Sequence, residues 1–139
     1  MGFAEDIQRN IDKALINMSD NLNEITGKLF YGIRQDTPIL TGVLTNSWYT
    51  AVGSHDTTIG SAPDTNGSAS TSRIASTLAS NPFLGKDNTV TMTNSVDYAY
   101  RAEYIGWRKN DPTNTTKWNW TGNVTNYAMV WNNLTKAKV

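Results

Sequence analysis

The groups in this chain with the clearest chemical potential are a single histidine and its two neighbours. Ser54, His55 and Asp56 follow one another and contain the three side chains of a serine-hydrolase triad. A triad also needs an oriented base, a strained nucleophile and an oxyanion hole. The Gly-x-Ser-x-Gly turn that supplies the last two does not occur in the sequence. We therefore expect His55 to be a solvated turn residue, and we keep a small hydrolase that uses His55 as an alternative.

The acidic residues offer little for catalysis or metal binding. Asp97 and Glu103 are a candidate acid–base pair, but they are six residues apart in a short predicted helix and point in different directions. We expect Glu103 to form a salt bridge or to accept a backbone hydrogen bond. The chain has no cysteine, and it lacks the acidic spacing of an EF-hand and a glycine-rich phosphate loop. We predict no catalytic residue, no cofactor and no metal, and therefore not an enzyme.

Aromatic residues form the third candidate surface. Trp107, Trp118 and Trp120, with Tyr100 and Tyr104, could build a platform that stacks on sugars or bases. Platforms for nucleic acid usually lie among lysines and arginines, whereas this chain has zero net charge. Because such rings supply a large apolar area, burial in a core or a subunit interface is favoured. A glycan-binding module that uses this Trp/Tyr surface is the alternative.

Length and composition limit what these groups can belong to. The 139 residues predict a single domain, 1–139, which is long enough to bury a core without disulfides. No stretch approaches the ~20 apolar residues of a membrane span, and the N-terminus lacks the features of a signal peptide. We expect a soluble protein made in the cytosol.

A long helix is the first element that must position the candidate residues. Apolar side chains recur at steps of three and four from Ala4 to Ile33, which predicts an amphipathic helix over about residues 3–35. A polar stretch and Gly27 weaken it, and we expect a break or bend near residues 19–23. The average step is nearer 3.6 than 3.5, which favours packing on a globular core over an intersubunit helix bundle. A domain of this size cannot cover the whole helix, so part of it is available to a partner.

The middle of the chain predicts a small antiparallel sheet. Alternating residues indicate strands over residues 44–52 and 89–93, and Thr57–Ile59 is expected to pair with the first of them. A long variable loop, residues 54–88, separates the two strands. A short helix or turn around residues 72–79 is compatible with its spacing. We expect this loop to order against a neighbouring subunit.

Two helices complete the prediction and give an α+β fold class. The first is short, spans Tyr98–Ile105, is capped by Asp97 and is closed by Gly106. The second is a C-terminal helix capped by Asn123. In this helix Val124, Tyr127, Ala128, Trp131 and Leu134 are predicted to share a face.

Two stretches carry motifs in a fixed order behind the long helix. The first, Thr-Pro-x-x-Thr-Gly-x-Leu-x-x-Ser-Trp, is formed by Thr37, Pro38, Thr41, Gly42, Leu44, Ser47 and Trp48. The second begins with the Thr-Asn pair at the end of a strand. It comprises Asn94, Tyr98, Ala99, Glu103, Tyr104 and Gly106. Together they resemble the neck, or tail-completion, protein family of long-tailed bacteriophages. The chain departs from the family pattern because Ala102 takes a leucine position and Ile105 is inserted.

The resemblance implies a structural virion protein of the head–tail junction. Such a protein would form a homo-oligomeric ring, sixfold or twelvefold, that completes the tail or joins it to the filled head. Its partners would be other phage neck and tail proteins, with DNA passing through the lumen as cargo and no membrane involved. It would be made in the host cytoplasm and located in the virion. Residues 107–122 look like an elaboration of this member, and Trp107, Trp118 and Trp120 are the candidate interface residues.

Overall fold

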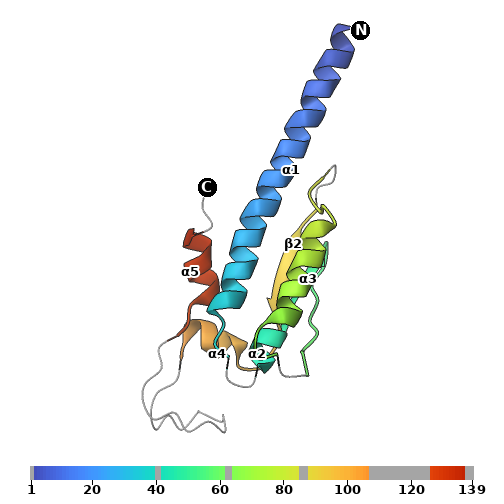
Figure 1. The fold of residues 1–139 in the computed structure, drawn as a ribbon. Helices are drawn as coiled ribbons and strands as arrows, with labels where there is room; N and C mark the ends of the chain where they lie inside the picture. The colour runs from blue at the N-terminus through green and yellow to red at the C-terminus, as the bar shows by residue number, and fades with distance from the viewer. Residues whose placement is uncertain (1, 40–41, 62–63, 85–87, 107–125, 137–139) are drawn as a thin grey trace, which may run out of the picture.

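The computed structural model describes residues 2–39, 42–61, 64–84, 88–106 and 126–136. The elements follow in the order α1 (Phe3–Asp36), α2 (Val43–Asn46), β1 (Trp48–Val52), α3 (Ser68–Ala79), β2 (Val90–Asn94), α4 (Ala99–Tyr104) and α5 (Met129–Lys136). In Figure 1, α1 runs from the top of the view down toward α4, with α5 on one side of its lower half and α3 on the other. The predicted α+β class is confirmed, with a long N-terminal helix, a two-stranded antiparallel sheet and a C-terminal helix.

α1 is one unbroken helix of 34 residues, about 50 Å long. The expected break near residues 19–23 is wrong, because poor helix formers of this kind cost less than about 0.7 kcal/mol each. The neighbouring α3 also holds this stretch, since the Asn23 side-chain amide donates to the Leu78 carbonyl oxygen at 3.3 Å. The helix ends before Pro38 as predicted, with Thr37 in an extended conformation.

The sheet pairs β1 with β2 in antiparallel register, from Trp48 opposite Asn94 to Val52 opposite Val90. The expected strand over residues 44–52 is shorter, because its first residues form α2. Pairing of β1 with Thr57–Ile59 is also wrong. The chain turns after β1, and the Gly53 N–H donates to the Thr89 carbonyl oxygen at 2.7 Å, so β2 takes the place beside β1.

The predicted long loop contains α3, which packs on its own subunit. Ile74 is fully buried in this helix. The Thr50 hydroxyl on β1 donates to the Arg73 carbonyl oxygen at 3.1 Å and lies 2.6 Å from the Thr77 hydroxyl. Residues 68–79 therefore pack against the sheet of the same chain, whereas the expected contact of the long loop with a neighbouring subunit stays a prediction.

The core lies where the second half of α1, the sheet, α4 and α5 come together. It is built from Ile33, Leu44, Trp48, Val96, Ala102 and Met129. Tyr98 rather than Asp97 occupies the N-cap of α4, whereas Gly106, with φ +76°, closes this helix as predicted.

The predicted C-terminal helix needs correction, because Tyr127 and Ala128 lie before its first residue. The helix begins at Met129, directly after Ala128 in a left-handed conformation. This start directs Met129 and Asn133 inward and leaves Trp131 and Leu134 exposed. The predicted cap Asn123 and Val124 lie outside the described residues.

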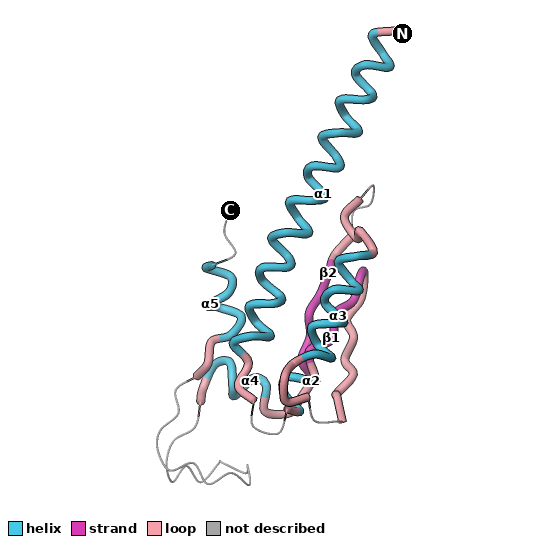
Figure 2. The backbone as a smooth tube through the Cα atoms, viewed as in Figure 1, coloured by secondary structure: helices cyan, strands magenta, loops and turns pink. Residues whose placement is uncertain are grey.

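The N-terminal half of α1 extends past the other described elements (Figure 2). Every residue from 2 to 18 is exposed. The interpretation of the apolar stripe as one side of a globular core is therefore correct only for the second half of the helix, where α3 and α5 contact it.

Candidate assembly site

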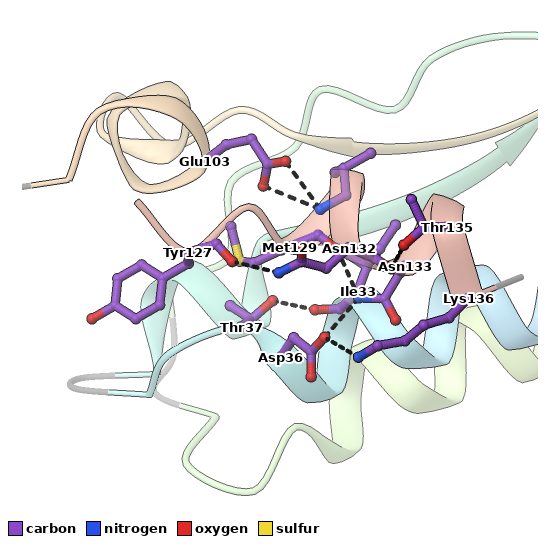
Figure 3. Close-up of polar contacts among 11 residues, drawn as sticks. Ile33, Asp36, Thr37, Glu103, Tyr127, Met129, Asn132, Asn133, Thr135 and Lys136 are labelled. Atoms are coloured by element: carbon purple, nitrogen blue, oxygen red, sulfur yellow. Dashed lines mark hydrogen bonds and ion pairs between the residues drawn. The ribbon is translucent and has the colours of Figure 1, made fainter. Parts of the chain in front are cut away.

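The first motif forms a buried joint between the end of α1 and the start of β1. The Thr37 hydroxyl donates to the Ile33 carbonyl oxygen at 2.7 Å and accepts a hydrogen bond from the Trp48 indole N–H at 2.8 Å. Thr37 and Trp48 are both buried, so this bond satisfies an indole N–H that is removed from water. Figure 3 shows Thr37 and Ile33 beside α5. The threonine and the tryptophan of the motif thus act as a pair.

Gly42 is required for its backbone angle and for a close contact. Its φ is +83°, and a Cβ atom at this position would lie 2.5 Å from the backbone nitrogen of Asp64. Either condition disfavours a side chain. The turn leads into α2, after which the Ser47 hydroxyl donates to the Val43 carbonyl oxygen at 2.7 Å and accepts from the Gly60 N–H at 3.0 Å. Gly42 and Ser47 therefore hold Gly60 and Asp64 against the first motif.

The two motifs meet at the start of the sheet. Asn94 lies opposite Trp48 in the strand register, and its side-chain amide donates to the Leu44 carbonyl oxygen at 2.8 Å. Its side-chain oxygen accepts from the Val96 N–H at 3.2 Å. Leu44, Trp48 and Val96 belong to one apolar cluster, and Pro38 is half-buried beside the end of α1. The structure thus brings most described residues of the two motifs into one joint.

Glu103 in the second motif holds the start of α5. Its two carboxylate oxygens accept from the Val130 N–H at 3.1 Å each, and one accepts from the Trp131 N–H at 3.2 Å. These N–H groups lie in the first turn of α5, where they lack partners inside the helix, and a negative charge there is favourable. The expectation that Glu103 accepts backbone hydrogen bonds is confirmed, and Figure 3 shows Glu103 facing the start of α5.

Asn133, in the middle of α5, bonds this helix to α1. Its side-chain amide donates to the Asp36 carboxylate at 2.8 Å and to the Met129 carbonyl oxygen at 2.7 Å (Figure 3). The Lys136 ammonium lies 3.6 Å from the same carboxylate. Sequence reasoning missed Asn133, because nothing in the pattern marks a polar residue that faces inward.

Arg73 on α3 is the second residue that sequence reasoning missed. Its guanidinium donates to the carbonyl oxygens of Asn46 and Trp48 at 2.6 and 3.1 Å, and to the Asn46 side-chain oxygen at 2.8 Å. It also lies over the Tyr49 ring, 3.8 Å from the centroid. The sequence pattern gives no signal for this role, because adjacent residues of a helix such as Arg73 and Ile74 point in different directions.

The remaining residues of the second motif divide between core and surface. Tyr98 and Ala99 pack against the core cluster, and burial raises the pKa of the Tyr98 phenol. Tyr104 is exposed, and its ring lies 4.8 Å from that of Tyr100. Tyr104 therefore belongs to a surface pair of aromatic rings rather than to the joint.

Two exposed apolar surfaces lie outside this joint. The arm stripe is one face of α1 and consists of Phe3, Ile7, Ile11, Leu15, Met18 and Leu22, which are 43–81% exposed. The α4–α5 patch consists of Tyr100, Tyr104, Ile105, Trp131 and Leu134, which are 46–67% exposed. Both surfaces present more apolar area than single scattered residues do.

The expected residues do not all fall within the described structure. Thr41 and the candidate interface residues Trp107, Trp118 and Trp120 lie outside the described residues. His55 is exposed, and the Asp56 carboxylate beside it accepts hydrogen bonds from the Thr58 hydroxyl and N–H at 2.6 and 3.0 Å. The hydroxyl and N–H of Thr58 hold the pKa of Asp56 below its usual value. Asp56 is thus engaged by Thr58.

Three comparisons with known proteins found no similar protein. No family model, no curated protein and no solved structure matches the chain. Within the described residues, no group of three His, Asp or Glu side chains is arranged to hold a metal ion. None of the helices in the described part of the chain has the length and apolar character needed to cross a membrane.

Proposed function

We propose that this chain is a structural protein of the bacteriophage head–tail junction. In this proposal it assembles as a homo-oligomeric ring that completes the tail or joins it to the filled head. Its partners are other neck and tail proteins, DNA passes through the ring as cargo, and the chain carries out no reaction.

The observation that carries the proposal is the arm stripe of α1. Six large apolar side chains are exposed on one helix face, and leaving that face in water is unfavourable by about 25 cal/mol per Å². The face continues the one that packs on the core lower down the same helix. A chain with this feature is suited to burying the stripe against another protein.

The motif residues that carry the resemblance to neck proteins also support the proposal through their contacts in the joint. Thr37, Gly42, Trp48 and Asn94 act through hydrogen bonds, backbone angle and packing. Their contacts are those of residues that set the direction of a chain. Motif residues with such contacts suit a building block better than a catalyst.

The test uses the purified chain and purified phage particles. We expect size-exclusion chromatography with light scattering to give an oligomer, and electron microscopy to give closed rings of sixfold or twelvefold symmetry. We also expect mass spectrometry of particles to detect the chain, and loss of its gene to yield separate filled heads and tails. Particles that lack the chain, or a purified sample that turns over a substrate, would contradict the proposal.

A glycan-binding module remains the second candidate, because Tyr100, Tyr104 and Trp131 present exposed rings. Quenching of tryptophan fluorescence by glycans in a sample that stays monomeric would favour it over the ring.

A further inference from the structure

The arm stripe repeats every eleven residues. Ile7, Met18 and Leu29 are spaced by eleven, as are Ile11, Leu22 and Ile33. An eleven-residue repeat corresponds to about 3.67 residues per turn, so the stripe runs almost straight along the helix. Leu29 and Ile33 at the end of both series pack in or against the core. The arm thus continues a surface that already packs lower down the helix.

The α4–α5 patch is a second surface of similar extent. Tyr100 and Tyr104 contact each other on α4. The Glu103 carboxylate bonds the Trp131 N–H and keeps α5 beside α4. From their exposed fractions, the arm stripe and the patch each offer about 600 Å².

These two areas are similar enough for the arm stripe and the α4–α5 patch to cover each other. Complete burial of both surfaces against each other would remove at most about 1,200 Å² in total, which reaches the lower end of stable protein–protein interfaces at ~1,200–2,000 Å². A contact between two arm stripes would leave the patch in water. A single contact between stripe and patch covers both surfaces.

The two surfaces cannot meet within one chain. The arm projects from one end of the molecule, whereas α4 lies near the other end of α1 (Figure 1). α1 is a continuous helix without a hinge between them. A contact between stripe and patch must therefore join two copies of the chain.

We infer that the arm stripe of one subunit packs on the α4–α5 patch of the next copy. This inference rests on the proposed ring and names the surfaces that form it. Two different surfaces in contact make a heterologous interface, which closes into a ring when its rotation allows and otherwise extends as a filament. The partner is a second copy of this chain.

The absence of cysteine from the sequence makes a cross-linking test clean. Leu15→Cys and Trp131→Cys each replace an exposed side chain, so both variants should fold, which circular dichroism checks. After the two variants are mixed and oxidised, we expect the mixed disulfide dimer as the main product. Leu15→Cys mixed with Thr57→Cys, an exposed position outside both surfaces, should give little dimer. Strong dimerisation of Leu15→Cys alone would mean that arms contact arms and would overturn the inference.

A second measurement separates this inference from the proposed function. In the otherwise native chain, Ile7→Gln with Ile11→Gln should shift the mass measured by light scattering from oligomer to monomer. If these variants stay oligomeric, the arm does not form the contact, while the ring itself stands. If the mixed disulfide forms but the chain is absent from phage particles, the contact stands and the head–tail function fails.

Discussion

The two halves of α1 carry the same apolar spacing in different surroundings. In the second half, Leu29 and Ile33 meet the core, and α3 and α5 hold the helix from both sides. In the first half, Ile7 and Ile11 take the equivalent positions and are exposed. The difference teaches that helical periodicity tells which face is apolar, whereas the rest of the fold decides whether the chain covers that face itself.

The largest effect should come from the joint that anchors the covered half. Trp48→Ala removes a buried ring and its hydrogen bond to Thr37, so the free energy of unfolding should fall by about 3–5 kcal/mol. Trp48→Phe keeps most of the packing and should lose about 1–2 kcal/mol. Urea denaturation measures both, and an unchanged midpoint for Trp48→Ala would contradict the burial of this side chain.

Substitutions at two glycines separate the cost of a left-handed backbone from the cost of a steric clash. Gly42→Ala meets both a left-handed backbone and the Asp64 backbone 2.5 Å away, and should lower the free energy of unfolding by about 3 kcal/mol. Gly53→Ala has a similar φ with open space around it, and should lose about 1 kcal/mol. Thermal unfolding compares the two, and equal losses would show that the contact with Asp64 is unimportant.

The attachment of α5 predicts a smaller change. Glu103→Gln removes the negative charge that the Val130 and Trp131 N–H groups face, and should lower the free energy of unfolding by about 1 kcal/mol. The matched control is Asp97→Asn, an exposed position before α4, which should change it by less than about 0.5 kcal/mol. The comparison fails if both variants unfold at the same urea concentration.

The smallest effect is expected in the arm. Ile11→Ala should change the free energy of unfolding of the monomer by less than about 0.5 kcal/mol. Ile33→Ala, two eleven-residue repeats further along, should lower it by about 2–5 kcal/mol because Ile33 is buried. Denaturation at a concentration that keeps the chain monomeric measures both, and a large loss for Ile11→Ala would mean that its own chain covers the arm.

Sequence reasoning predicted the elements whose determinants are local. The long helix, its end before Pro38, the second strand and the closing Gly106 follow from periodicity, proline sterics and glycine freedom. The expectation that Glu103 accepts a backbone hydrogen bond is also confirmed.

Features that depend on distant partners were not predictable in this way. β2 takes the place beside β1 that residues 57–59 were expected to fill. Arg73 and Asn133 find their acceptors through the tertiary fold, on segments 27 and 97 residues away in the sequence. The inner face of α5 depends on the left-handed Ala128 before it, and alanine carries no signal for that conformation.

The unbroken length of α1 gives it the geometry of a lever. A tilt of about 5° at Asn23, which bonds to α3, would displace Phe3 by roughly 2.5 Å, because about 30 Å of helix lies between them. That displacement is about the size of a small side chain. The hydrogen bonds of Asn23, Asp36 and Thr37, together with the packing of α3 and α5 on the helix, therefore govern the direction of the far tip, although none of them lies near it.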